Sequence, residues 1–193
     1  LFNYDYDTDT LTQIDSLTNS IDFKRQIHSA YSTFSNVFMN FEFLLGFRLE
    51  YTDRVITQNI INETYTVNRL DYFPTLHISR KITEVQQIQA SYSRRIRRPR
   101  EWYLDPFPNY SDPYNIRMGN PELEPEYTDS YELNYQYKLK GSSFLSVETY
   151  FRQTNNMIER IKYVDENNIM INTFDNIDND YALGIELMSN LAI

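Results

Sequence analysis

The sequence of 193 residues contains no cysteine, only 4 glycines and only 2 histidines. The lack of cysteine suits an oxidising compartment, although cysteine-free proteins of this size are also common in the cytosol. His28 and His77 lie far apart, and no residues of metal-binding type show the spacing of a recognised metal motif. We therefore predict no metal site and no cofactor.

Long hydrophobic runs are also absent. No stretch approaches the roughly 18 consecutive apolar residues that mark a membrane-spanning helix, and the overall hydropathy is negative. A spanning helix is thereby excluded, but a β-barrel is not, because each barrel strand has only one apolar face. The chain opens into an acidic segment, residues 3–9, with neither the basic start nor the apolar core of a signal peptide. We expect an internal piece of an exported protein.

Positive charge is in deficit, with a formal net charge of −9. This balance argues against a nucleic-acid partner, because neutralising phosphates supplies most of that affinity. The one basic cluster, residues 94–100, does not reverse it. Aromatic side chains are abundant instead, with 17 Tyr and 12 Phe. Such a content is typical of β-strands and of the interfaces of a membrane barrel.

Alternation of apolar and polar residues predicts strands rather than helices. It is clearest in residues 41–51 and returns in 131–139 and 181–187, with weaker versions in 26–34, 75–82, 87–97 and 145–160. Wound as a helix, residues 41–51 would scatter aromatic rings and charges around the whole circumference. We predict that Phe41, Phe43, Leu45, Phe47 and Leu49 face lipid, whereas Glu42, Arg48 and Glu50 face the interior.

Strand lengths and connections fit a bilayer. A strand of 11 residues is about 36 Å long and, tilted by about 45°, covers roughly the 25 Å apolar band of an outer-membrane barrel. We expect short turns around Asn36, at 83–84 and at 140–143, and long polar loops at 52–72, 98–128 and 162–180, with residues 3–22 completing a further outer loop. The predicted fold class is all-β, an antiparallel up-and-down meander forming part of a transmembrane β-barrel.

Several motifs carry a family resemblance. The most specific is the run 119–126, GNPELEPE, which follows YSRRIRRP at 92–99, LDPF at 104–107 and YSDP at 110–113. Strand motifs are GFRLEY at 46–51, FPTL at 73–76 and YALGIE at 181–186. Together they cover most of residues 22–190 and resemble the outer-membrane β-barrel family of TonB-dependent receptors, in the version common in Bacteroidetes.

The resemblance implies a location in the cell outer membrane and uptake of a specific ligand, powered through the TonB complex. A complete barrel of that family has about 22 strands. Residues 1–193 would then be a fragment of one barrel domain, with the plug domain and the remaining strands absent. The implied partners are outer-membrane lipid, that plug, those strands, the TonB complex and a small ligand that the sequence does not identify.

The run 119–126 also has a physical interpretation. Pro121 and Pro125 fix φ and bias the preceding residues toward extended conformations, and Gly119 permits a positive φ. We interpret the run as an adaptor between loop and strand. Its glutamates, spaced by two in an extended segment, share one face without an apolar pocket, so we predict no glycosidase and no enzyme.

Candidate ligand-binding residues lie in and beside the long loop. The aromatic ones, Trp102, Tyr103, Phe107, Tyr110 and Tyr114, can stack on sugar rings or aromatic chelators, or can pack on each other to stiffen the loop. Strand alternation places Arg95 and Arg97 in the lumen. There they can draw an anionic ligand or pair with acids such as Glu132.

Two other functions stay open at this stage. A soluble all-β module that holds glycans with its tyrosines requires a second layer to cover the apolar face, and the sequence has none left over. A small self-contained outer-membrane barrel of about eight strands requires intact termini.

Overall fold

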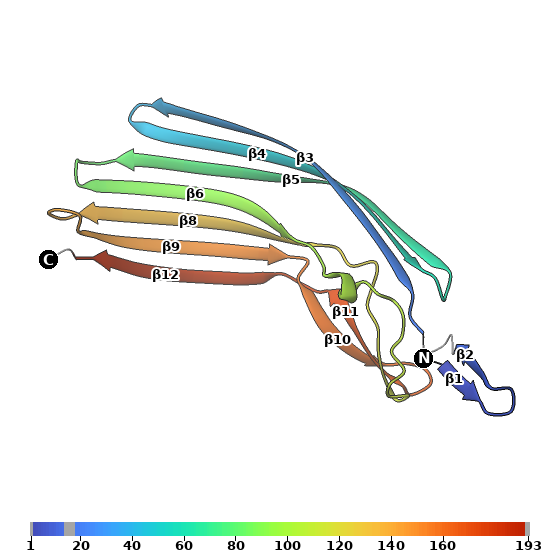
Figure 1. Cartoon of the computed structure of the whole chain (residues 1–193). Coiled ribbons are helices and arrows are strands. Elements are labelled where there is room, and N and C mark those ends of the chain that lie inside the picture. The colour runs from blue at the N-terminus through green and yellow to red at the C-terminus, as the bar shows by residue number, and fades with distance from the viewer. Residues whose placement is uncertain (1, 14–17, 192–193) are drawn as a thin grey trace.

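The computed structural model describes residues 2–13 and 18–191 and is dominated by one antiparallel sheet (Figure 1). Seven strands form it in the order β12-β9-β8-β6-β5-β4-β3. They are β3 (Ile21–Phe38), β4 (Phe41–Gln58), β5 (Glu63–Lys81), β6 (Gln86–Arg97), β8 (Glu126–Lys138), β9 (Phe144–Asn155) and β12 (Asp180–Asn190). Every neighbouring pair is antiparallel, so the predicted all-β meander is confirmed.

The sheet is open. Within the described residues, β3 and β12 each pair on one side only, so the seven strands do not close into a small barrel. Two smaller sheets accompany it: the hairpin β1 (Phe2–Asp5) and β2 (Thr10–Gln13), and a three-stranded sheet of β7 (Asn115–Arg117), β10 (Ile158–Val164) and β11 (Met170–Asn176). Among residues 2–13 and 18–191, no helix has the length and apolar character needed to cross a membrane.

Tight turns gather at one end of the sheet and long connections at the other (Figure 1). The turns at 82–85 and 139–143 lie where the sequence predicts them. The short turn predicted around Asn36 is present but lies three residues later, because β3 runs on to Phe38 and the chain reverses at Met39 and Asn40. Both of these residues have positive φ, 48° and 65°, as a two-residue hairpin turn requires.

The loop predicted at 52–72 is also wrong. β4 and β5 stay paired from Phe41↔Arg80 to Gln58↔Glu63, and only residues 59–62 connect them. The segment is polar, yet it is rich in Thr, Val, Ile and Tyr, which favour strands. The polar composition of this segment therefore does not mark the end of the hairpin.

Two further boundaries differ from prediction. Residues 145–160 are not one strand, because Asn156 adopts a positive φ of 56° and β10 leaves the main sheet. Residues 162–180, predicted as a loop, contain the end of β10 and all of β11. Only 98–125 is a long connection with little regular structure, holding β7 and a short 3-10 helix, η2 (Glu101–Tyr103).

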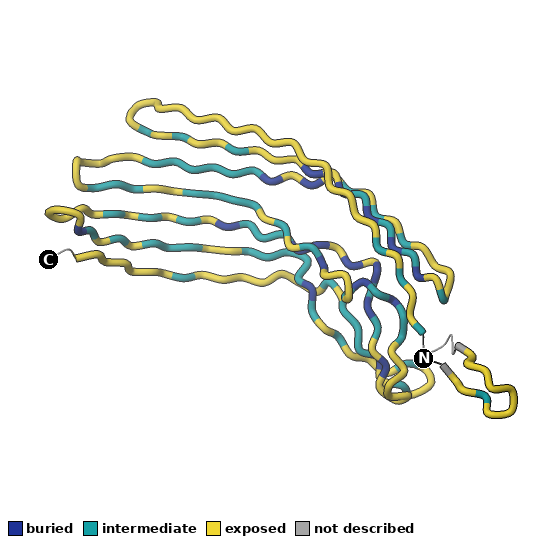
Figure 2. Tube along the Cα trace, in the orientation of Figure 1, coloured by how far each residue is buried: buried dark blue, intermediate teal, exposed yellow. Residues whose placement is uncertain are grey.

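The predicted assignment of the two faces is confirmed. Leu45, Phe47 and Leu49 are exposed, and strand alternation places them on the face opposite Glu50, whose carboxylate contacts Arg98 of the long connection. Most buried segments lie toward the end of the sheet that carries the long connections (Figure 2). Even-numbered residues of β4 lie on the opposite face, where Glu42 accepts a hydrogen bond from Ser79 at 3.1 Å and Glu50 is buried.

A row of aromatic rings crosses four adjacent strands on the outer face. Ring centroids are 5.0 Å apart for Tyr92–Tyr131, 6.2 Å for Tyr131–Phe151 and 6.1 Å for Phe151–Tyr181. Aromatic girdles of this kind mark the interfaces of membrane barrels, since the rings have both apolar and polar parts.

Candidate functional site

The long connection 98–125 folds onto the inner face of the three long strands β3, β4 and β5. Leu104 and Leu123 from the connection, Ile56 from β4 and Ile158 from β10 are buried together. Beside them Arg54 donates from Nη2 to the Pro121 carbonyl oxygen at 2.8 Å. The connection and the start of β10 therefore share a small core with the wall.

Charged side chains hold the base of this connection. Arg98 Nη2 lies 2.6 Å from a Glu50 carboxylate oxygen and 3.9 Å from one of Asp71. The Tyr127 hydroxyl donates to the same Asp71 at 2.5 Å. Glu50 and Asp71 are both nearly buried, so these contacts are less screened than surface ion pairs.

This cluster sits where the sheet divides. Pairing between β5 and β6 ends at Thr75↔Ser93, whereas β4–β5 and β6–β8 continue outward. Arg98 follows β6, and its acidic partners belong to β4 and β5. The cluster thus joins the two halves of the sheet beyond their last shared backbone pair.

Gly119 owes its place to a close backbone approach and not to a positive φ. A Cβ there would lie 2.5 Å from the Tyr103 carbonyl oxygen and 2.7 Å from backbone atoms of Asp105. Gly119 N donates to Asp105 O, and Asn120 N donates to Tyr103 O, each at 2.7 Å. The predicted positive φ is wrong, because Gly141 is the one glycine that has it among the described residues.

The path after Gly119 is also less extended than predicted. Asn120 begins a turn, with its carbonyl oxygen accepting from Leu123 N at 3.3 Å and its side chain accepting from Glu122 N at 3.0 Å. β8 then begins at Glu126, directly after the buried Pro125. The motif is an adaptor, but it turns before it descends.

Asparagine side chains tie the connection to the hairpin β10–β11. Asn120 donates to Phe174 O at 3.2 Å, and Asn172 donates to Ile116 O at 3.2 Å. Asn176 accepts from Glu124 N at 2.8 Å and donates to Glu124 O at 3.0 Å. Together with the parallel pairing of β7 and β11, these bonds make the two segments one outer loop body, residues 98–125 and 156–179.

The turn of the β10–β11 hairpin is held by one carboxylate. Asp165 accepts from Ile169 N at 2.8 Å and from Asn167 N at 2.9 Å. These backbone hydrogen bonds, that to Ile169 first, lower the pKa of Asp165 from its ordinary value because they stabilise the charged form.

The structure brings some of the predicted aromatic residues together. The Trp102 ring lies 4.1 Å from Tyr103 and 5.3 Å from Phe174, and Tyr103 lies 4.1 Å from Phe174. Tyr114 is 77% exposed and Tyr110 is exposed as well. Neither lines the cavity beside Trp102.

That cavity has a volume of about 230 Å³ and lies between the connection and the hairpin β10–β11. Its walls are formed by Trp102, Asp105, Phe107, Asn109, Arg117, Met118, Gly119, Arg160, Asn172 and Phe174. We name it the loop cavity. Sequence reasoning missed Arg117, Arg160, Asn172 and Phe174, because nothing in their spacing shows that β7, β10 and β11 meet.

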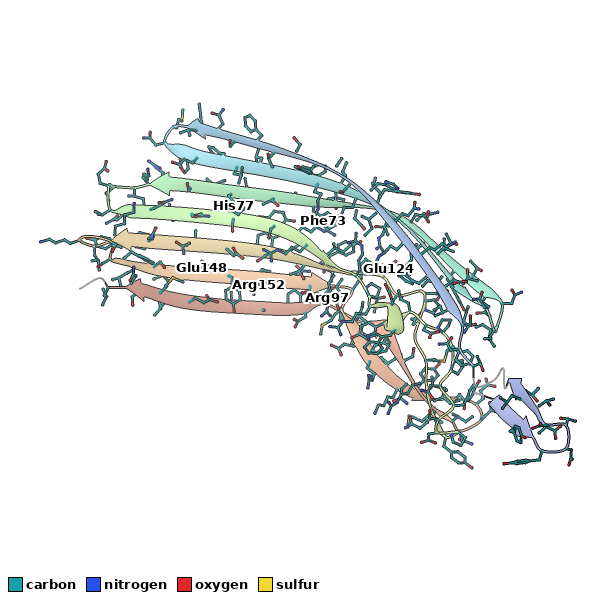
Figure 3. The ribbon with its side chains drawn as sticks, viewed as in Figure 1. Phe73, His77, Arg97, Glu124, Glu148 and Arg152 are labelled. Carbon is teal, nitrogen blue, oxygen red and sulfur yellow. The ribbon has the colours of Figure 1, made fainter. Side chains whose placement is uncertain are left out.

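Arg95 and Arg97 lie on the predicted face, and one of the two pairs with an acid. Both share a face with residues of β8 through the pairs Arg95↔Thr128 and Arg97↔Glu126. Arg97, which is labelled at the loop end of β6 in Figure 3, forms an ion pair with Glu126. Arg97 thus pairs with an acid as predicted, but the acid is not Glu132, which forms no ion pair with a described cation and accepts hydrogen bonds from Ser91 and Ser130, each at 3.0 Å.

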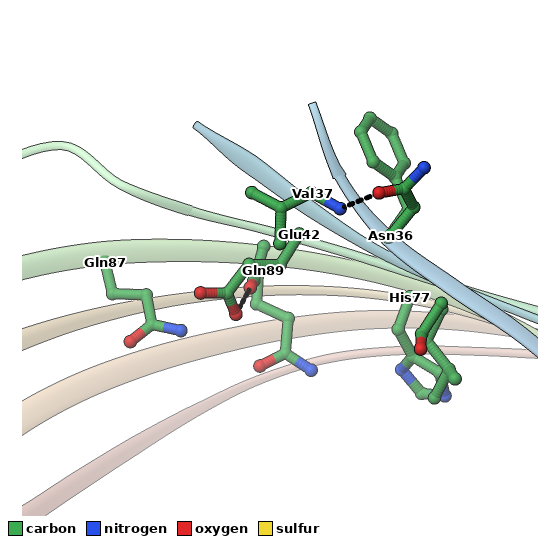
Figure 4. Close-up of a pocket in the computed structure, with 10 residues that line it drawn as sticks. Asn36, Val37, Glu42, His77, Gln87 and Gln89 are labelled. Atoms are coloured by element: carbon green, nitrogen blue, oxygen red, sulfur yellow. Dashed lines mark hydrogen bonds between the residues drawn. The ribbon is translucent and has the colours of Figure 1, made fainter. Parts of the chain in front are cut away.

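The inner wall has two larger hollows. One, of about 520 Å³, is lined by residues that include Arg48, Phe73, Arg95 and Glu132. The other, of about 670 Å³, lies near the tight turns and is lined by Glu42, His77, Gln87 and Gln89 among others (Figure 4). Within the described ranges, no group of His, Asp and Glu side chains is arranged to hold a metal ion.

The sequence profile of the outer membrane protein beta-barrel family matches residues 1–193. The chain belongs to this family. Membership confirms the predicted outer-membrane location and the β-barrel fold, and it excludes the soluble module. Among curated proteins, no sequence is significantly similar to it.

Solved structures show the same barrel architecture. The siderophore receptor PirA from Pseudomonas aeruginosa matches with a TM-score of 0.57 and 14% identity over 89% of this chain and 40% of PirA. The hemophore receptor HasR of Serratia marcescens, solved with its hemophore HasA and heme, matches with a TM-score of 0.68 and 14% identity over 86% of this chain and 32% of HasR.

The copper transporter OprC matches with a TM-score of 0.63 and 14% identity over 96% of this chain and 29% of OprC. The chain thus spans between 29% and 40% of the length of these proteins. At this identity the matches establish the fold, and the resemblance to receptor barrels is confirmed at that level. The Bacteroidetes version stays a prediction.

Proposed function

We propose that this chain is the wall and outer loop body of a receptor that takes up a specific ligand by TonB-dependent transport. One observation carries the proposal: two long segments fold as a single body over the inner face of an open barrel sheet and enclose the loop cavity. A barrel that only anchors in lipid has no need of such a body. PirA, HasR and OprC, named as receptors or a transporter, support it.

In this proposal residues 1–193 are one segment of a longer barrel domain. The free edges of β3 and β12 continue the wall through further strands of the same protein. Its polar inner face surrounds a plug domain, which gates passage and contacts the TonB complex. The wall supplies a frame and a binding vestibule, so the proposal requires no catalysis.

The ligand contact that we assign first is the aromatic wall of the loop cavity, Trp102 and Phe107. Tyr103 supports this aromatic wall by packing on Phe174. Arg95 contributes from the inner wall, where it forms no ion pair with a described carboxylate. Arg97 is committed to Glu126 and serves the loop base instead.

The test uses the full-length protein. Deleting its gene and, separately, inactivating TonB should abolish uptake of the same nutrient. Replacing Trp102 and Phe107 together by Ala should weaken binding of that nutrient about 30-fold, since each lost stacking contact removes on the order of 1 kcal/mol.

The matched control is Tyr110→Ala with Tyr114→Ala, which removes two rings from the same connection outside the cavity. This control should bind as the parent does. Uptake that persists without TonB would contradict the transport proposal. Equal binding by both double variants would show that the loop cavity is not the ligand site.

A further inference from the structure

The loop cavity carries two cations that the protein itself leaves without an acidic partner. Arg117 comes from β7 and Arg160 from β10, segments that are more than forty positions apart in the sequence. Four other arginines, Arg48, Arg69, Arg97 and Arg98, are ion-paired. Neither cavity arginine forms an ion pair with any carboxylate in the described part of the chain.

Asp105 is the one acidic residue among the described residues that line the cavity, and both of its carboxylate oxygens accept hydrogen bonds. Asp105 accepts from the Asn19 side chain at 2.5 Å through one oxygen and from Phe107 N at 3.0 Å through the other. Its charge lies within the cavity wall, but its two oxygens are used by the fold.

Flat apolar surfaces complete the site. Trp102 and Phe174 meet edge to face at 5.3 Å, and the Arg160 guanidinium lies over the Phe174 ring, 5.5 Å from its centroid. Phe107 and Met118 add further apolar walls. An arrangement of rings and guanidinium groups suits a ligand that is both planar and anionic, since guanidinium groups bind carboxylates in a planar fork.

The size of the cavity limits the ligand group. A cavity of about 150 Å³ is known to admit benzene, so a volume of about 230 Å³ accommodates one ring with an acidic substituent. It does not accommodate a large glycan or a folded protein.

We propose that the loop cavity is a recognition site for an aromatic acid, a ring bearing a carboxylate, either free or as a terminal group of a larger ligand. Arg117 and Arg160 bind the carboxylate, and Trp102 and Phe107 hold the ring, while Phe174 positions Trp102 and Arg160 by its ring contacts. The inference rests on the proposed function in that it names the ligand class for the same outer loop body.

The experiment titrates the full-length protein in detergent with benzoate, benzamide and acetate by ligand-observed NMR. Benzoate should bind at least about tenfold more tightly than either other probe, because benzamide lacks the charge and acetate lacks the ring. The variant Arg117→Gln with Arg160→Gln should bind benzoate and benzamide equally.

The control variant, Lys138→Gln with Lys140→Gln, lowers the net charge by the same amount at the opposite end of the sheet and should keep the preference for benzoate. Amide-exchange protection of residues 98–125 verifies that the loop body stays folded in each variant. Equal affinity for benzoate and benzamide in the parent, or an unchanged preference in the arginine variant, would overturn the inference.

Failure here is separable from failure of the proposed function. TonB-dependent uptake of some nutrient, combined with no preference for benzoate over benzamide, refutes the aromatic-acid site and leaves transport standing. A clear preference for benzoate in a protein whose loss impairs no TonB-dependent uptake supports the site and refutes transport.

Discussion

Replacing Gly119 by Ala should release the outer loop body while leaving the barrel wall intact. The added Cβ would lie 2.5 Å from Tyr103 O and 2.7 Å from both N and O of Asp105. Side chains can rotate away from such an approach, but backbone atoms cannot. The segment 119–120 must therefore separate from 103–105.

The magnitude follows from the bonds that this separation removes. Gly119 N→Asp105 O and Asn120 N→Tyr103 O, each 2.7 Å long, would both be lost. A net contribution of about 1 kcal/mol for each gives a local destabilisation of roughly 2 kcal/mol, or about 30-fold more opening. Packing lost around the buried Leu104 adds to this figure.

The assay is hydrogen exchange of the full-length protein in detergent, read by mass spectrometry over residues 98–125. Exchange there should accelerate by about 30-fold or more in Gly119→Ala, and β4 should be unaffected. Gly46→Ala is the matched control, because its Cβ would meet only the Thr75 side chain, with Cβ at 3.4 Å and Oγ1 at 3.9 Å, which are ordinary contacts. Unchanged protection of 98–125 in Gly119→Ala would refute the close-packing argument.

Three further changes test other parts of the structure. Arg98→Met should loosen the start of the connection 98–125 by about 1–3 kcal/mol, because the buried Glu50 and Asp71 lose this cation. The control Arg100→Met replaces an exposed arginine and should have little effect. Limited proteolysis of 98–125 distinguishes the two variants. Leu45→Arg puts a charge on the lipid face and should destabilise the folded barrel by about 2–4 kcal/mol near the midplane. The control Leu44→Arg puts the same charge on the inner face and should be tolerated. Urea titration in lipid vesicles measures both, and equal destabilisation would contradict the assigned faces. Backbone hydrogen bonds, that from Ile169 first, lower the pKa of Asp165, so its contribution to the β10–β11 turn is present above the unfolded pKa and is lost as the pH falls through the lower folded pKa. The protection factor at 165–169, which is the exchange rate corrected for the intrinsic rate at each pH, should therefore fall below about pH 3.8, and Asp165→Asn should remove that dependence.

Much of the wall was predictable from local pattern alone. In β4 a period of two places Phe47 and Leu49 on one face and Arg48 and Glu50 on the other, and the structure confirms it. The pattern works because the side-chain period of a strand is fixed, so one buried or lipid-facing side determines the register. It failed at strand ends, where 52–58 remain paired although lipid no longer selects apolar residues.

The outer loop body was beyond reach of the same reasoning. Its contacts join residues distant in sequence, such as Arg54 with Pro121 and Asn120 with Phe174. Asparagine was available as a signal only for local turns, yet Asn172 and Asn176 act between segments. Trp102 and Phe107 were identified because aromatic density is visible in sequence, whereas their cationic neighbours Arg117 and Arg160 come together only in the fold.

The position of the aromatic row determines the environment in which the loop cavity operates. Tyr92 belongs to that row, and Arg98 follows it by six residues toward the loop end. At about 3.3 Å per residue and a tilt of about 45°, Arg98 lies roughly 14 Å beyond the row. Arg98 and the start of the connection are therefore outside the apolar band, and the loop cavity, which lies farther from the band, opens to water.

Exposed charges in water are screened within about 8 Å at physiological ionic strength. The nearly buried Glu50 and Asp71 retain their attraction for Arg98 under those conditions. Moderate salt should consequently lower the affinity of the exposed Arg117 and Arg160 for an anion at concentrations that leave the outer loop body folded.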